Sequence, residues 1–114
     1  MEKLPFAKGL LVESAKLRDY LLNQDHPVGG TKARWFLKHG FELNDIDVCG
    51  EALKAHARSR PVVEVSQTNF GKKFRIECSL EAPKGETSCL RAIWIIEGEA
   101  APRLVSAYPI KRGN

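Results

Sequence analysis

The stretch from Lys73 to Leu80 reads Lys-Phe-Arg-Ile-Glu-Cys-Ser-Leu, and its apolar side chains stand at every second position. This alternation is typical of a β-strand that turns one face to the core and the other to water. The next run, Leu90–Ile96, is apolar on both sides apart from Arg91 and therefore indicates a central strand. With further strands expected over Val63–Ser66 and Leu104–Tyr108, this half of the chain is predicted to form a four-stranded antiparallel meander.

The register of the first two hairpins follows from keeping apolar residues opposite one another. In the second hairpin this register sets Glu77 opposite Arg91, and in the first it sets Glu64 opposite Arg75. Opposite charges on facing positions stabilise an antiparallel pair, so both outcomes support the register. The apolar pairs that it predicts are Phe74 with Trp94, Ile76 with Ala92, and Val65 with Phe74.

The last hairpin leaves two registers open. They differ by one residue, and the slip exchanges Ser106 and Tyr108 with Val105 and Ala107 between the two faces of the sheet. The sequence does not choose between them.

Before Pro61 the apolar spacing is helical. Ser14 and Thr31 are expected to cap the first two helices, and Gly40 is expected to end the second. The expected elements are a short edge strand at 10–13 and helices over 14–22, 32–39 and from 44 or 45 to about 60.

Helices that cover one face of such a sheet make an α+β fold. We expect a single domain over residues 1–114, with a helical part over about 14–60 and a sheet over about 62–109. The face opposite the helices would carry Glu64, Arg75, Glu77 and Arg91.

Composition and charge narrow the function classes. The chain has 18 Lys and Arg against 14 Asp and Glu, a net charge of +4, which suits a nucleic-acid partner without requiring one. Its cysteines, Cys49, Cys78 and Cys89, form no C-x-x-C pair, so we expect inert packing residues in a reduced, cytoplasmic protein. No apolar stretch is long enough to span a membrane, and neither a metal nor another cofactor is expected.

The densest polar feature runs from His26 to Arg34. Its two glycines lead into a helix start, where free backbone amides favour an anion, and Lys32 and Arg34 add positive charge. His26 exchanges a proton near neutral pH. Cleaving a phosphodiester without a metal needs such a set of acid, base and cations. The alternative interpretation is a simple turn followed by a helix cap.

The sheet offers a second candidate surface. Arg75 and Arg91 could clamp a phosphate, or they could form a ladder of ion pairs with neighbouring glutamates. Tyr108 could donate a proton or stack on a base, or it could close the edge of the core.

The remaining aromatic and histidine residues are expected to be structural. Trp35 and Trp94 are predicted in the core, His39 at a helix C-terminus, and His56 at the surface or its boundary.

The segments His26–Gly29, Lys32–Phe36, Ala92–Ile96 and Pro102–Pro109 resemble a family of small bacterial domains with the pattern HPxGxxKAxxF…WI…PxLxxAYP. Such domains occur alone and inside larger bacterial toxins, often beside a small antitoxin. A more distant similarity is to the EndoU/colicin/RelE-like (BECR) ribonuclease fold, whose members are typically metal-independent ribonucleases.

The resemblance implies a metal-independent ribonuclease that acts as the toxin of a toxin–antitoxin or related conflict system. The catalytic residues that it implies are His26, Lys32, Tyr108 and Arg91, and the substrate-binding residues are Arg75 and Ser106. Arg34 is added to the substrate-binding residues because of its charge beside the helix start. RNA and a small antitoxin or immunity protein would be its partners. The alternative is a non-catalytic interaction module, either immunity- or antitoxin-like or RNA-binding. The sequence leaves the oligomeric state open.

Overall fold

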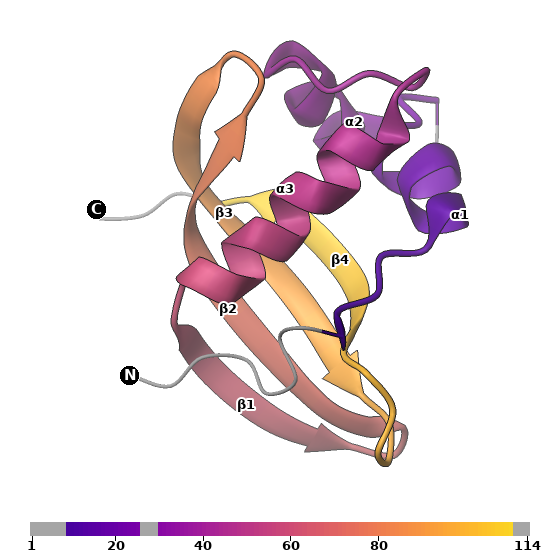
Figure 1. Cartoon of the computed structure of the whole chain (residues 1–114), viewed down its shortest axis with the longest axis vertical. Helices are drawn as coiled ribbons and strands as arrows, with labels where there is room; N and C mark the ends of the chain where they lie inside the picture. Colours follow the sequence, from indigo (N-terminus) through magenta and orange to yellow (C-terminus); the bar gives the residue numbers. More distant parts are fainter. Residues whose placement is uncertain (1–8, 26–29, 111–114) are drawn as a thin grey trace.

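The computed structural model describes residues 9–25 and 30–110, and it confirms the predicted α+β class (Figure 1). Helical elements come first, and a sheet follows. The helical elements are α1 (Ser14–Lys16), the π-helix η2 (Leu17–Leu21), α2 (Gly30–Lys38) and α3 (Ile46–Ser59). The strands are β1 (Val62–Thr68), β2 (Gly71–Ala82), β3 (Gly85–Ile96) and β4 (Arg103–Pro109).

The four strands form one antiparallel sheet in the order β1-β2-β3-β4, as the sequence predicts. The predicted registers of the first two hairpins are confirmed. Glu77 stands opposite Arg91, and Glu64 stands opposite Arg75. The apolar partners also match, with Phe74 opposite Trp94, Ile76 opposite Ala92, and Val65 opposite Phe74.

A register shift in the third hairpin settles the alternative that the sequence left open. The pairing of β3 with β4 shifts between Ile93 and Trp94, which inserts an extra residue into β4. Tyr108 therefore lies opposite Arg91 on the face away from the core, while Ala107 stays buried opposite Ala92.

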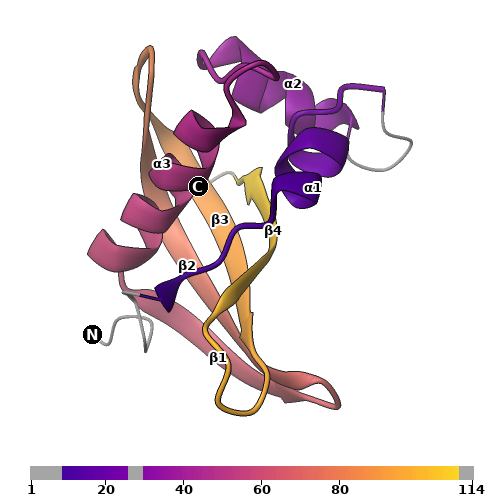
Figure 2. The same cartoon turned by 45° about the vertical axis from the view of Figure 1, so that its right-hand side comes forward.

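The helices lie against different parts of the sheet. Helix α3 crosses one face, whereas α1 lies on the side of the sheet where β4 forms the edge (Figures 1 and 2). Helix α2 also contacts β4. None of the described helices is both long enough and apolar enough to cross a membrane. The core lies between α3 and the sheet and extends under η2 and α2; its largest fully buried side chains include Trp94, Phe36, Phe41, Leu21, Leu22 and Leu53.

The first helix differs from the regular α-helix that the sequence predicts over 14–22. After one turn it continues as η2, in which the Leu22 amide donates to the Leu17 carbonyl at 2.9 Å. A π-helix bonds i to i+5, so both Leu21 and Leu22 can share the face of Leu17. All three leucines are buried, and Tyr20 is left half-exposed beside β4.

Helix α2 begins earlier than predicted. It starts at Gly30, so Thr31 lies inside the helix rather than capping it. Position 30 has no room for a side chain, because a β-carbon there would collide with the Gln24 carbonyl oxygen. At its other end the helix stops at Gly40 as predicted, with φ at 103°.

The predicted edge strand at 10–13 is reduced to a single parallel bridge between Leu11 and Arg103. The Leu11 amide donates to Pro102, and its carbonyl accepts from Leu104. The strand cannot extend further along the chain, because α1 begins three residues later at Ser14.

Two further expectations are wrong. His56 is buried at 3% exposure, because it falls on the helical stripe of α3 that also carries Cys49, Leu53 and Ala57. Its Nε2 lies 3.0 Å from the Cys78 carbonyl oxygen.

Cys78, predicted to be packed, is instead exposed. The pairing of β1 begins at Val62 opposite Ile76, so none of the described strands lies beside Cys78 on that edge of β2. Cys49 is buried as predicted, and burial raises the pKa of its thiol to about 12.

Candidate functional site

Side chains from η2, α2 and β4 meet where the helices reach over the edge of the sheet. The hydroxyl groups of Tyr20 and Ser106 lie 3.4 Å apart, within hydrogen-bond distance. Lys32 Nζ donates to the Tyr20 hydroxyl at 3.5 Å. The same ammonium group lies 4.6 Å from the centre of the Tyr108 ring. Three segments far apart in the sequence therefore converge around one lysine.

Tyr108 lies between two cations. Lys32 approaches its ring from α2, and the Arg91 guanidinium lies 5.8 Å from the ring centre. Both distances are within the range of a cation–π interaction. The Tyr108 side chain, ahead of the Glu77 carboxylate, raises the pKa of Arg91, so this guanidinium stays charged.

Arg91 belongs to a ladder of ion pairs on the open face of the sheet. Glu77, only 8% exposed, accepts from Arg91 Nε at 2.6 Å. Arg75 Nε lies 3.1 Å from the same carboxylate oxygen, close enough for an ion pair but not aligned as a hydrogen bond. Arg75 also pairs with Glu64 at 2.9 Å. Of the two interpretations that the sequence allowed, the ion-pair ladder is therefore present.

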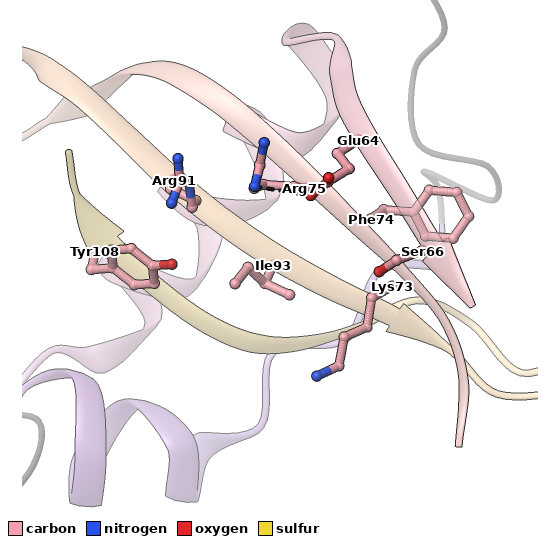
Figure 3. A pocket seen from close by; sticks show the side chains of 8 residues that line it. All are labelled: Glu64, Ser66, Lys73, Phe74, Arg75, Arg91, Ile93 and Tyr108. Atoms are coloured by element: carbon pink, nitrogen blue, oxygen red, sulfur yellow. Dashed lines mark ion pairs between the residues drawn. The ribbon is translucent and has the colours of Figure 1, made fainter. Parts of the chain in front are cut away.

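A shallow hollow of about 130 Å³ opens beside this ladder. Figure 3 shows the side chains of Arg75 and Arg91 standing side by side above the sheet, with Ile93 below them and Lys73 further along β2. Eight residues from all four strands line the hollow: Glu64, Ser66, Lys73, Phe74, Arg75, Arg91, Ile93 and Tyr108. Arg91 and Tyr108 line the hollow and also contact the group formed by Tyr20, Lys32 and Ser106. The hollow and this group therefore form one continuous surface, named here the junction site.

The structure brings four of the predicted site residues together: Lys32, Arg91, Ser106 and Tyr108. Arg75 lies next to this set through Glu77. Arg34 does not join it, because Arg34 is exposed and stands about 200° around α2 from Lys32. His26 lies outside the described residues, in the four-residue segment between Asp25 and Gly30.

The site residues predicted from the sequence leave out Tyr20 and Lys73, which belong to the junction site, and Glu77, which pairs with both of its arginines. The sequence places Glu77 opposite Arg91, on the open face and in an ion-pair ladder with the arginines, and it places Lys73 at a polar position of β2. The apolar spacing places Tyr20 on one face of a regular helix with Leu17 and Leu21, and the π-helix that turns it towards Ser106 leaves no signal in that spacing. For Lys73, the alternation along β2 already placed it on the face of Arg75 and so could have marked it.

Among the described residues, no group of three or more His, Cys, Asp or Glu side chains is placed to hold a metal ion. Besides the carboxylates of Glu64 and Glu77, which pair with the arginines, the junction site offers ammonium, guanidinium and hydroxyl groups. Such groups can bind an anion, stabilise developing negative charge and transfer protons.

Comparisons with known proteins identify the family. Residues 3–111 match the family described as "Domain of unknown function (DUF6883)". The match covers nearly the whole chain, so the chain belongs to this family. No curated protein matches the chain.

A solved structure shares the fold. It is a chain of the contact-dependent growth inhibition toxin–immunity protein complex from Klebsiella pneumoniae 342, with a TM-score of 0.70 and 17% sequence identity. The likeness covers 87% of this chain and 98% of that chain. At this level of identity it shows a common fold and nothing about activity.

Proposed function

We propose that this member of the DUF6883 family is a metal-independent endoribonuclease, acting as the toxin of a bacterial toxin–antitoxin or related conflict system. The observation that carries the proposal is the convergence of Lys32, Tyr108 and Arg91 at the junction site. These residues come from α2, β4 and β3, and they meet on a face that also carries the hollow.

The chemistry of RNA cleavage matches these groups. The 2′-oxygen attacks the phosphorus, the bond to the 5′-oxygen breaks, and negative charge builds on the phosphoryl oxygens. Lys32, helped by Arg91, would stabilise that charge. Tyr108 would position the substrate or protonate the leaving oxygen, and His26, which lies outside the described residues, would exchange protons. Arg75 and Ser106 would contact the substrate on the sheet.

The role in a conflict system rests on likeness rather than on the site. The solved structure that shares the fold belongs to a contact-dependent growth inhibition toxin–immunity protein complex. The sequence pattern also resembles domains found inside larger bacterial toxins, and more distantly the BECR ribonucleases. A toxin of this kind would act on RNA in the cytoplasm and would be silenced by a small partner protein.

The test is cleavage of total RNA by the purified protein in EDTA. We expect cleavage by the wild type and a loss of about 10²- to 10³-fold in Lys32→Ala, the usual cost of removing one group that stabilises transition-state charge. Lys38→Ala, an exposed lysine at the far end of the same helix, is the matched control and should keep full activity. RNA that stays intact with the wild type, or equal losses in the two variants, would overturn the proposal.

The second candidate function is a non-catalytic interaction module. The observation in its favour is that Arg75 and Arg91 already pair with Glu77, so the ladder is explained without a substrate. RNA binding that weakens with salt but leads to no cleavage would favour an RNA-binding module. Co-purification with the product of an adjacent gene, without nuclease activity, would favour an immunity- or antitoxin-like protein.

A further inference from the structure

We propose that Tyr20 is the proton acceptor of the junction site, taking the proton of the attacking 2′-hydroxyl from the RNA substrate. The inference rests on the proposed ribonuclease function and assigns a role to a residue that the apolar spacing groups with Leu17 and Leu21 on one helix face. It is carried by the contacts of the Tyr20 hydroxyl, which faces the site rather than the leucines of its own helix.

Three elements surround the Tyr20 side chain. Ser106 of β4 lies 3.4 Å from its hydroxyl, and Lys32 Nζ of α2 lies 3.5 Å from it. Lys16 of α1 lies 5.2 Å from the centre of the ring. The charges of Lys32 and Lys16 both act on Tyr20 in the same direction and favour the ionised oxygen. Lys32 contacts both the Tyr20 hydroxyl and the Tyr108 ring, and it therefore links the two tyrosines.

These neighbours favour the phenolate. The hydrogen bond with Ser106 lowers the pKa of Tyr20, and the charge and hydrogen bond of Lys32 lower it further, with a smaller effect from the charge of Lys16. Burial of the ring acts in the opposite direction but does not cancel them. A base is most effective when its pKa approaches the working pH, so a phenol shifted downwards is better suited to accept a proton than an ordinary tyrosine.

The step balances without any further reactant. The 2′-hydroxyl gives its proton to the Tyr20 phenolate while its oxygen forms a bond to phosphorus. The bond from phosphorus to the 5′-oxygen breaks, and the electron pair stays on that oxygen, which takes a proton from the acid of the site. Tyr108 is the candidate acid, because its ring contacts Lys32, the lysine that also donates to Tyr20. The products are a 2′,3′-cyclic phosphate and a free 5′-hydroxyl. Proton loss from Tyr20 and proton uptake by the acid then return the site to its starting state.

A purely positioning role for Tyr20 makes different predictions. If the phenol only holds Lys32 in place, Tyr20→Phe slows cleavage but leaves the shape of the pH profile unchanged. If it accepts the proton, Tyr20→Phe removes the limb of kcat/KM that rises with pH and lowers the plateau by about 10²-fold or more.

The composition allows a direct titration. The chain has two tyrosines, so Tyr108→Phe leaves Tyr20 as the sole source of tyrosinate absorbance. We expect its midpoint below the ordinary value of about 10, a rise when Ser106→Ala or Lys32→Ala is added, and a smaller rise with Lys16→Ala. Circular dichroism of each variant checks that the fold is kept.

The outcomes separate this inference from the proposed function. A Tyr20 midpoint at or above its ordinary value, or a Tyr20→Phe enzyme that keeps the rising limb, would overturn the inference while RNA cleavage by the wild type still stands. A wild type that cleaves no RNA would overturn the proposed function, and the role of Tyr20 with it. A lowered midpoint together with the lost limb supports the inference.

Discussion

Glu77 is the residue on which the open face of the sheet depends. Its carboxylate is nearly buried and forms ion pairs with two arginines, Arg75 from its own strand and Arg91 from β3. A buried carboxylate without partners would be costly, and so would two arginines held side by side without a negative charge between them. Glu77 therefore holds Arg91 against Tyr108 and Arg75 beside the hollow.

Replacing Glu77 with Gln tests this role. The change keeps the size of the side chain but removes its charge, and we expect it to lower the free energy of unfolding by about 2 kcal/mol. Glu64→Gln is the matched control, because Glu64 also pairs with Arg75 but its side chain is 56% exposed. An exposed pair contributes less than about 1 kcal/mol. Urea denaturation measures both, and equal losses would show that Glu77 is no more important than a surface partner.

Single residues were the least predictable part of the site. The sequence marked Lys32 and Tyr108 because polar groups stood beside a helix start and at a strand end. It did not mark Tyr20, because apolar spacing assigns a residue to a helix face only if the helix is regular, and η2 is not. The expectation for His56 was wrong because its position in the apolar stripe of α3, with Leu53 and Ala57, buries it.

At the scale of elements, the C-terminus of α2 depends on one glycine. The Gly40 amide donates to Leu37, and the next amide, that of Phe41, donates to Phe36, the pattern of a Schellman motif. The rings of Phe36 and Phe41 then pack with their centres 5.9 Å apart. Gly40 also touches the turn between β2 and β3, where its missing side chain leaves room for Pro83 and Lys84.

Gly40→Ala should therefore cost stability in two ways. The residue has φ at 103°, which a side chain disfavours, and a β-carbon would lie 2.9 Å from Pro83 Cβ. Gly85→Ala separates the two costs, because Gly85 has φ at 116° but nothing within 4 Å of an added β-carbon. We expect a loss of about 1 kcal/mol for Gly85→Ala and about 2–3 kcal/mol for Gly40→Ala in urea denaturation. Equal losses would mean that the contact with Pro83 relaxes freely.

Strands were more predictable than their irregularities. Alternation and opposite charges determined the registers of two hairpins, because a slip of one residue would move Phe74 and Ile76 out of the core. The shift between Ile93 and Trp94 was not predictable, since both registers of β4 bury apolar side chains. That shift places Tyr108 on the open face, so the candidate site depends on the feature of the sheet that local sequence determines least.

At the scale of the whole molecule, positive groups extend from the helices across the open face. Lys32 contacts Tyr108 at the β4 edge, and Arg91 lies beside Tyr108 on the next strand, β3. On β2, Arg75 and Lys73 continue along the lining of the hollow. Successive positions on one face of a strand are two residues apart, so Lys73 and Arg75 stand about 7 Å apart along β2. This arrangement suits an extended single strand, whose phosphates need several cations and whose bases need a flat ring such as that of Tyr108.

Lys72 and Lys73 provide the comparison that tests this path. They are neighbours on β2 and therefore point to opposite faces of the sheet, and Lys73 lines the hollow. Lys73→Ala should weaken binding of a 2′-deoxy-substituted, uncleavable single strand and reduce the slope of log affinity against log salt by about 0.7. Lys72→Ala removes the same charge and should change neither value. Fluorescence anisotropy at several salt concentrations measures both variants. If the two lysines have equal effects, attraction to the strand comes from the net charge of the protein, and the strand does not follow the open face.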